Sequence, residues 1–304
     1  MKMIKTAIIT ALSLSLGAGI FFKPQTSLFN LGENTSTQQN AGDLEANSSP
    51  VEQARMLLRK VQMRGKCVPE PATLDSNFAA RVGQACQINR DQMRAYLNQY
   101  HINEWEVGGT LDLPLSSNTD GSGNLNYARY MVIHDTSYPR YGSSLPDNIN
   151  DESWEWNRLG RWVANVTHVY VNRIGDSKTT TPFHEGKTAT KRERYIMGEG
   201  ASKGLYLHIE LIQPRKARPG YGRHNDVDAP TLGFTDAQYK RLALLYTIAS
   251  VRKGEWIIPA FHACVDAGIR YAHDDPQNFE LEKMFAAMNE LWADIDRINS
   301  GLSK

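Results

Sequence analysis

The sequence has no excess of charge of either sign. Its 34 Lys and Arg residues balance 33 Asp and Glu residues, which leaves a formal net charge of +1 over 304 residues. A basic excess is the usual mark of a protein that binds nucleic acid, so no nucleic-acid partner is predicted. The chain also lacks internal repeats and a low-complexity core, and we expect one good-sized core with a smaller attached unit.

Cysteine is scarce, with 3 residues in the whole chain. Cys67 and Cys86 flank a short segment, and their separation suits a local disulfide in an oxidising compartment. Cys264 is then left over, and a buried thiol is a commoner role for such a residue than a reactive nucleophile. We therefore expect a Cys67–Cys86 disulfide and an unpaired Cys264.

The N-terminus carries an export pattern. Residues 1–23 begin with the positively charged stretch MKMIK and continue as an apolar run with small residues near its end. This pattern is typical of a signal peptide or of an uncleaved membrane anchor, and the sequence leaves both open. No Cys lies near the end of the run, which argues against a lipid-anchored lipoprotein. The expected location is the periplasm or cell envelope, with the chain either released or tethered to the membrane.

The composition changes along the chain and predicts its domains. Residues 24–50 are rich in Ser, Thr, Asn, Gln and Gly, which indicates a flexible linker. Residues 51–110 contain two stretches with apolar residues at helical spacing, the second of them preceded by Asn89 as a candidate N-cap. We expect a small helical N-terminal subdomain there and a main domain over residues 111–304.

The main domain alternates strand-like and helical patterns, which predicts an α/β fold. Apolar runs of strand type end at turn signals in residues 128–134, 167–175 and 204–212. An amphipathic helix follows, with Thr235 as its N-cap and Gly254 at its end, and a last helix covers residues 278–298.

Candidate metal ligands stand near the ends of three segments. The segment MVIHDTS contains His134, IIPAFH ends at His262, and DDPQNF contains Asp275. Two imidazoles and one carboxylate are a complete protein complement for a catalytic zinc ion, which keeps a fourth position open for water. The ligands lie far apart in the chain and form no local motif, so spacing alone is a weak signal.

Six segments in one order carry a resemblance to a known family. They are MVIHDTS, THVYVNRIGDS, LYLHIEL, GFTDAQYKRLALLYTIAS, IIPAFH and DDPQNF. In this order they resemble the zinc-dependent N-acetylmuramoyl-L-alanine amidases of the type 2 family, which includes the peptidoglycan recognition proteins. The resemblance runs from about Tyr130 to about Phe285, roughly half of the chain.

The resemblance implies a fold, a metal and a reaction. The fold would be a mixed central β-sheet flanked by helices, and His134, His262 and Asp275 would hold one Zn²⁺ ion. Asp274 is the competing ligand, and Asp275 is preferred because it immediately precedes Pro276, as the family's ligand precedes its proline. The reaction would be hydrolysis of the amide bond between N-acetylmuramic acid and L-alanine in peptidoglycan or muropeptides.

Two further residues receive catalytic roles from the resemblance. Glu210, in LYLHIEL, stands where the family has its catalytic glutamate, and alternation places it on one strand face with Tyr206 and His208. His273 occupies a position where related amidases commonly have Lys, and would stabilise the oxyanion in its protonated form. The segment over residues 213–233 departs from the family as an apparent insertion.

Two alternative functions stay open at this point. Some relatives bind peptidoglycan without cutting it, and a secreted cell-wall-degrading toxin would use the same chemistry. The four residues His134, His262, Asp275 and Glu210 favour the enzyme. The sequence does not distinguish intact sacculi from released anhydromuropeptides as substrate, and it leaves the role of the N-terminal subdomain and the oligomeric state unknown.

Overall fold

The structure is a computed structural model. It describes residues 48–62, 66–142, 144–216 and 233–301. These residues belong to one compact unit, Gln39–Lys304. The predicted signal or anchor, nearly all of the predicted linker and most of the predicted insertion lie outside the described residues. Among the helices that are described, none is long and apolar enough to cross a membrane.

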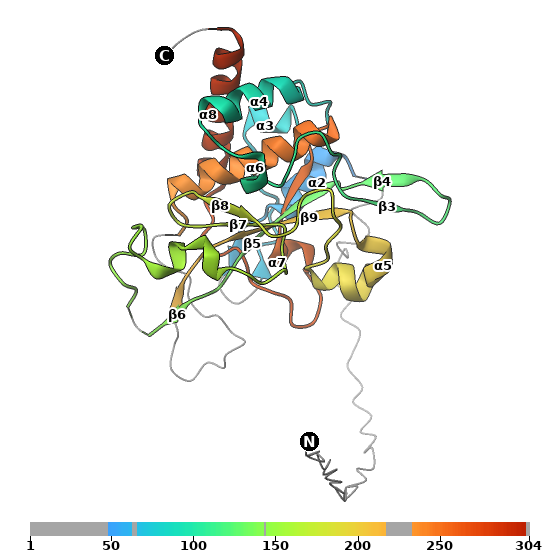
Figure 1. The fold of residues 1–304 in the computed structure, drawn as a ribbon. Coiled ribbons are helices and arrows are strands. Elements are labelled where there is room, and N and C mark those ends of the chain that lie inside the picture. Colours follow the sequence, from blue (N-terminus) through green and yellow to red (C-terminus); the bar gives the residue numbers. More distant parts are fainter. Residues whose placement is uncertain (1–47, 63–65, 143, 217–232, 302–304) are drawn as a thin grey trace, which may run out of the picture. The chain divides into compact units, whose positions relative to one another are not determined.

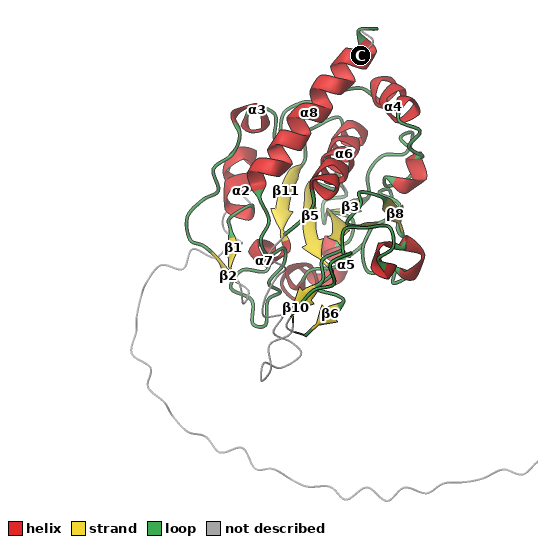
Figure 2. Ribbon diagram, turned by 90° about the vertical axis from the view of Figure 1, so that its left-hand side faces the viewer, coloured by secondary structure: helices red, strands yellow, loops and turns green. Residues whose placement is uncertain are grey.

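A five-stranded sheet with the order β11-β5-β9-β7-β8 lies at the centre of this unit (Figure 2). The strands are β5 (Tyr130–Asp135), β7 (Val169–Val171), β8 (Ser177–Thr179), β9 (Tyr206–Leu211) and β11 (Ile258–Phe261). Neighbours pair in parallel except for β8, which is antiparallel to β7. The predicted α/β fold with a mixed sheet is confirmed.

The register of the sheet sets which side chains are neighbours. His134 on β5 is opposite Glu210 on β9, and Tyr170 on β7 is opposite Glu210 from the other side. Side chains at paired positions of adjacent parallel strands point to the same face of a sheet. His134, Glu210 and Tyr170 therefore form a row across one face, with His208 two residues before Glu210 on that face.

Two long helices, α6 (Asp236–Lys253) and α8 (Leu281–Asn299), lie side by side on the upper side of the sheet in Figure 1. Thr235 caps α6 by accepting a hydrogen bond from the Gln238 backbone, and Gly254 ends it with a left-handed φ of 77°. Both ends are as predicted, because each is fixed by residues close by in the sequence. The shorter helices α5 (Glu199–Ser202) and α7 (His262–Val265) lie below the sheet in the same view.

The N-terminal segment contains three α-helices and a small hairpin among its described residues, and it shares its core with the sheet. It contains α2 (Pro50–Leu57), α3 (Ser76–Ala79), α4 (Arg90–Gln99) and a small hairpin of β1 (Val61–Gln62) and β2 (Lys66–Cys67). Asn89 caps α4 by accepting from the Gln92 backbone, which confirms the predicted N-cap. Leu57 and Phe78 belong to the same buried cluster as Met131 of the central sheet.

The disulfide differs from the prediction. Cys67 is bonded to Cys264, with 5.7 Å between their Cα atoms, so the predicted Cys67–Cys86 bond and the unpaired Cys264 are both wrong. The reason is tertiary: strand β2 packs against α7, which carries Cys264. The half-buried thiol of Cys86 instead donates to the carbonyl oxygen of Ile88, and burial raises its pKa to about 11.

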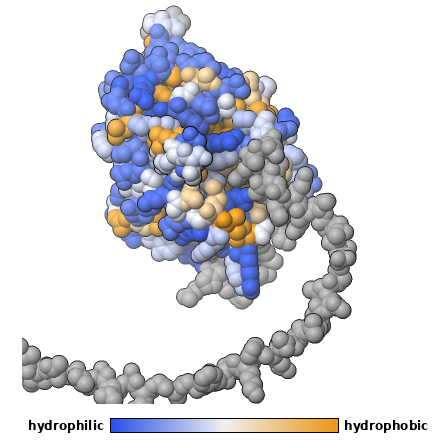
Figure 3. All heavy atoms as spheres, turned by 90° about the vertical axis from the view of Figure 1, so that its right-hand side faces the viewer, coloured by the Kyte–Doolittle hydropathy of each residue, from blue (hydrophilic) through white to orange (hydrophobic). Residues whose placement is uncertain are grey.

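The remaining elements are short. They are η1 (Glu104–Glu106), β3 (Ser117–Thr119), β4 (Leu125–Tyr127), β6 (Arg140–Tyr141), η2 (Glu155–Asn157), η3 (Leu159–Arg161), the π-helical η4 (Arg192–Gly198) and β10 (Arg215–Lys216). On the face drawn in Figure 3, hydrophilic and hydrophobic groups of the described residues are interspersed in small areas. That face therefore does not present one extended apolar docking surface among the residues described.

Candidate metal centre

Three of the residues predicted from the sequence, His134, His262 and Asp275, meet at the carboxyl ends of β5 and β11. Nδ1 of His134 lies 2.9 Å from Nδ1 of His262, and these two atoms lie 3.5 and 3.1 Å from Oδ2 of Asp275. All three residues are buried. The fold brings them together because β5 and β11 are parallel neighbours, so that His134 at the end of one strand and His262 after the other meet at the same sheet edge.

The loop after α7 supplies the carboxylate of Asp275. The backbone N–H of Ala263 donates to the Asp275 carbonyl at 2.9 Å, and the Asp135 N–H donates to Oδ2 of the Asp275 side chain at 3.2 Å. The neighbouring Asp274 points elsewhere: it accepts from the side-chain amide of Gln277 at 2.5 Å and lies 3.7 Å from the Arg215 guanidinium. The structure therefore places Asp275, and not Asp274, with the histidines.

Each of the two imidazoles has a polar partner on its outer nitrogen. Nε2 of His262 lies 3.1 Å from Oδ2 of Asp266, and Nε2 of His134 lies 3.1 Å from Nδ1 of His208. Nε2 of His262 faces Asp266 and its Nδ1 faces Asp275, so the metal-free ring holds a proton on each nitrogen, and Nδ1 would release its proton to bind a metal. Both histidines thus direct Nδ1 toward the cluster.

In the metal-free cluster, the pKa values of the two histidines shift in opposite directions. Burial opposes a charge on His262, but Asp275 and Asp266 outweigh it and raise the pKa of this imidazole to about 10. Burial and the adjacent charge of His262 lower the pKa of His134 to about 3. Burial disfavours the Asp275 carboxylate, yet His262 and His134 hold its pKa well below the usual range. The site is therefore built to place a positive charge beside the Asp275 carboxylate.

The donor set fits a divalent cation of the zinc type. Zinc binds imidazole nitrogen at about 2.0–2.1 Å and carboxylate oxygen at about 2.0–2.2 Å in tetrahedral geometry, which puts neighbouring ligand atoms about 3.4 Å apart. The three separations of 2.9, 3.1 and 3.5 Å lie close to that value. Two neutral imidazoles with one carboxylate leave a fourth position for water or substrate.

Glu210 lies beside the cluster with an oxygen that no described residue satisfies. Its Oε2 atom is buried and has no hydrogen-bond partner among the residues that the structure describes. Burial raises the pKa of this carboxyl well above its ordinary value, and the nearby charges of Asp275 and Asp135 raise it further. Such a group calls for a polar molecule or a cation next to it, because a buried polar atom without a partner is costly.

An aromatic pair borders the strand position of Glu210. Tyr170, on the adjacent strand, is buried and donates from its hydroxyl to the carbonyl of Ala164 at 3.1 Å. The ring of Trp162 lies over it, with 5.4 Å between the centroids. These two rings restrict solvent on the Glu210 side, which contributes to the raised pKa of that carboxyl.

His273 lies at the open side of the cluster. Its ring stacks on the His262 ring at a centroid distance of 4.6 Å, and its Nδ1 lies 3.8 Å from Oδ1 of Asp275. The side chain is 59% exposed, in contrast to the buried residues of the cluster. Partial burial and the charge of His262 lower the pKa of His273, which favours its neutral form near pH 7.

Sequence reasoning did not identify the outer partners of the two histidines. Asp266 follows His262 by four residues, a spacing that joins side chains on a helical turn and could have been read from the sequence. His208 stands on the same strand face as Glu210, which was a weaker signal. Glu193, which lies 3.3 Å from His208, belongs to a charged stretch with no recognisable pattern.

Comparisons with known proteins give one structural match. No protein-family model and no curated protein sequence matches the chain. A crystal structure of a selenomethionine derivative of AmpD superposes with a TM-score of 0.31 and 19% sequence identity, covering 58% of this chain and 91% of that chain. A superposition of this quality carries no argument about activity, which must rest on the residues of the site.

Proposed function

We propose that the protein is a zinc-dependent N-acetylmuramoyl-L-alanine amidase that acts on peptidoglycan or muropeptides. The observation that carries the proposal is the buried cluster of His134, His262 and Asp275 beside the unsatisfied carboxyl of Glu210. The resemblance of six ordered sequence segments to this amidase family supplies the substrate class. Residues 1–23 support export to the periplasm or cell envelope as part of the same proposal.

The chain's own residues divide the work around one zinc ion. Nδ1 of His134, Nδ1 of His262 and a carboxylate oxygen of Asp275 would hold it. When bound, zinc lowers the pKa of a coordinated water toward about 7 and polarises a substrate carbonyl. Asp266 and His208 hold the outer nitrogens of the two imidazoles and so keep the rings oriented.

Glu210 would act as the general base and then as the general acid. Its position opposite His134 in the sheet puts its carboxyl next to the cluster, and its raised pKa in the metal-free protein reflects burial and two nearby carboxylates. The pKa of Glu210 would fall with a divalent cation held in the cluster, and its carboxylate would then accept a proton from the attacking water. The same oxygen would return the proton to the leaving amine.

His273 would donate a hydrogen bond to the oxygen of the scissile carbonyl. Its exposed position against His262 leaves it accessible to a substrate. The lowered pKa works against the protonated form expected from the sequence, so a neutral N–H is the donor we propose at pH 7. A His273→Ala variant should lower kcat with a smaller change in KM, because the hydrogen bond strengthens as charge develops on the oxygen.

The test is a digest of purified sacculi and, in parallel, of anhydromuropeptides, with products identified by mass spectrometry. Stem peptides with a new amino terminus at L-alanine are expected. Glu210→Gln should keep zinc while hydrolysis falls by about 10²- to 10⁴-fold, since it loses general acid–base catalysis. Zinc-loaded protein that pellets with sacculi but releases no peptide would support the non-catalytic binder instead. Cleavage of a glycosidic bond or of a bond within the stem peptide would contradict the proposed reaction.

A further inference from the structure

A buried chain of polar side chains extends from His134 away from the metal position. Nε2 of His134 lies 3.1 Å from Nδ1 of His208, and Nε2 of His208 lies 3.3 Å from Oε1 of Glu193. The side chains of His208 and Glu193 are both 0% exposed. Within the described part of the chain, neither His208 Nε2 nor Glu193 Oε1 makes a hydrogen bond to another residue. The 3.3 Å contact between these two atoms is thus the polar contact that each of them makes within the described residues.

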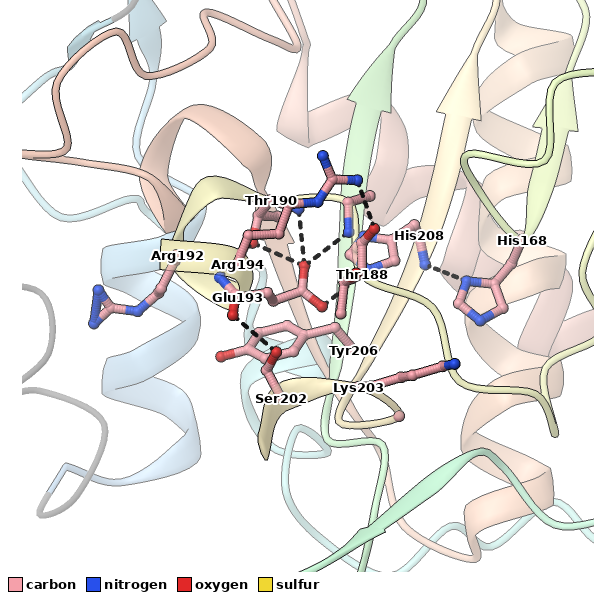
Figure 4. A network of polar contacts seen from close by, with 12 residues as sticks. His168, Thr188, Thr190, Arg192, Glu193, Arg194, Ser202, Lys203, Tyr206 and His208 are labelled. Carbon is pink, nitrogen blue, oxygen red and sulfur yellow. Dashed lines mark hydrogen bonds and ion pairs between the residues drawn. The ribbon is translucent and has the colours of Figure 1, made fainter. Parts of the chain in front are cut away.

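Glu193 is held in place through its other oxygen. Oε2 accepts from the backbone N–H groups of Ala189 and Thr190 at 3.2 and 2.9 Å and from the Thr190 hydroxyl at 2.8 Å. Burial disfavours its charge, but His208 and the Thr190 hydrogen bonds outweigh burial and lower the pKa of the carboxyl. Glu193 is thus a fixed carboxylate with one oxygen directed at His208, as Figure 4 shows.

His208 is fixed from a second direction by His168. The His208 backbone N–H donates to Nδ1 of His168 at 3.0 Å, and Nε2 of His168 lies 3.0 Å from the carbonyl of Glu185 and donates to it. The two rings stack with 5.7 Å between centroids and an interplanar angle of 21°. Figure 4 shows His208 between Glu193 and His168. The ring of His208 therefore has little freedom to rotate away from His134.

These contacts allow one consistent placement of the ring protons. A carboxylate facing Nε2 of His208 places the proton on that nitrogen, so Nδ1 of His208 is an acceptor. The acceptor in turn places the proton of His134 on Nε2, which leaves Nδ1 of His134 with its lone pair toward His262 and Asp275. The tautomer needed for a metal ligand is therefore set from the far end of the chain.

We propose that Glu193 and His208 are positioning residues that act through His134, fixing its tautomer and ring orientation for metal binding. This inference rests on the proposed zinc site and goes beyond it. The same segment also positions the second histidine: the backbone N–H groups of Lys191 and Arg192 donate to Asp266 at 3.1 and 2.9 Å, and Asp266 contacts His262. Residues 189–193 thus act on both imidazoles of the cluster.

Glu193→Gln is the first test because it changes the proton pattern with little change in shape. An amide has one oxygen, and the three donors that Oε2 satisfies would draw it, so the NH₂ group would face His208. His208 would then carry its proton on Nδ1, and His134 would be pushed toward the tautomer that cannot bind metal through Nδ1. We expect zinc affinity, measured by competition with a chelator, to fall about 10- to 100-fold.

A matched control is Glu199→Gln, which makes the same chemical change at a carboxylate that accepts from the Thr188 hydroxyl. Its zinc affinity should equal that of the wild type. The double variant Glu193→Gln/His208→Asn should recover affinity, since the Asn side-chain oxygen takes the place of Nδ1 and accepts from His134 without help from residue 193. A double variant that binds zinc no better than Glu193→Gln would contradict the proposal.

A second pair of variants decides the matter if Glu193→Gln does not fold. His208→Asn keeps an acceptor for His134 and loses the partner of Glu193, whereas His208→Gln does the reverse. The proposal expects at least 10-fold tighter zinc binding in His208→Asn than in His208→Gln. Equal affinities, or the opposite order, would show that His208 serves only to pair Glu193. ¹⁵N spectra of the imidazoles should also show the proton of His134 on Nε2 in the wild type.

The outcome is distinguishable from failure of the proposed function. A wild-type protein that binds no zinc would remove the metal centre itself. A wild-type protein that binds zinc, with Glu193→Gln binding equally well, would remove only the positioning role. Neither measurement depends on hydrolysis of a substrate.

Discussion

The two histidines of the cluster have Nδ1 atoms 2.9 Å apart, yet their surroundings are opposite in character. His262 has a carboxylate on each side, Asp275 at Nδ1 and Asp266 at Nε2, and its pKa is raised to about 10. His134 has an imidazole, that of His208, at Nε2, and burial together with the charge of His262 lowers its pKa to about 3.

The difference shows that the two imidazoles of one candidate metal site are held in two different ways. His262 is held by a carboxylate in direct contact, and a disulfide at Cys264 ties its helical turn to β2. His134 is held at the end of a strand and through a relay of two buried side chains, with the carboxylate at the far end. We therefore expect substitutions next to His262 to lower zinc affinity strongly. Substitutions on the His134 side should lower it less, the farther they lie from His134.

The largest effect is expected from removing a ligand. His134→Ala leaves two protein donors, which bind zinc much more weakly than three. We expect zinc binding and hydrolysis to be lost together while the far-ultraviolet circular dichroism of the wild type is kept. A zinc-replete and active His134→Ala variant would contradict the assignment of this histidine.

Removing the disulfide should have the next largest effect, and this bond lies on the His262 side. It joins residues 197 positions apart, and removing such a crosslink costs about 2–5 kcal/mol of unfolding free energy. Cys67→Ser should lower the midpoint of guanidinium unfolding, and Cys86→Ser, at the thiol outside the bond, should not. Equal loss in both variants would argue against the Cys67–Cys264 pairing.

Asp266→Asn tests the direct carboxylate. The backbone N–H groups of Lys191 and Arg192 compete with His262 for the single oxygen of the amide. We expect zinc affinity to fall about 10- to 100-fold, or about 1.4–2.7 kcal/mol. This loss should be at least as large as that of Glu193→Gln, because Asp266 touches the ligand and Glu193 acts through His208. A larger loss of zinc affinity in Glu193→Gln than in Asp266→Asn would contradict this difference between the two histidines.

The last prediction concerns acid stability and His168, which lies at the outer end of the His134 side. Burial and the neighbouring His208 lower its pKa from 6.5 to about 3, so the unfolded chain binds more protons between these values. The stability from neutral His168 is present above pH 6.5 and is lost as the pH falls toward 3, with a slope of at most about 1.4 kcal/mol per pH unit. His168→Asn keeps an acceptor for the His208 backbone and removes the titration. Metal-free His168→Asn should therefore lose stability less steeply in acid than the metal-free wild type; parallel curves would exclude this role.

Features that depend on nearby residues could be predicted from the sequence. Thr235 and Asn89 cap their helices as expected, because a cap joins atoms two or three residues apart. The cluster of His134, His262 and Asp275 came from the order of resembling segments, and the structure brings those three residues together.

Features that depend on tertiary packing could not be predicted in this way. The pairing of Cys67 with Cys264 follows from the contact of β2 with α7, whereas sequence separation favoured Cys86. Glu193 on η4 lies 3.3 Å from His208 on β9 through a tertiary contact, and no local sequence pattern indicates that contact. The pKa of His273 is likewise lowered by its partial burial and by the charge of His262, which disfavours the protonated form expected from its place in the motif.

The most direct test of the proposed metal centre measures zinc content and amide hydrolysis on the same samples of wild type, Asp275→Ala and Asp274→Ala. The two aspartates are adjacent, but only Asp275 lies with the histidines. We expect one zinc ion per chain and release of stem peptides for the wild type and for Asp274→Ala, and neither for Asp275→Ala. Asp275→Ala protein that keeps both its zinc and its activity would contradict the metal centre.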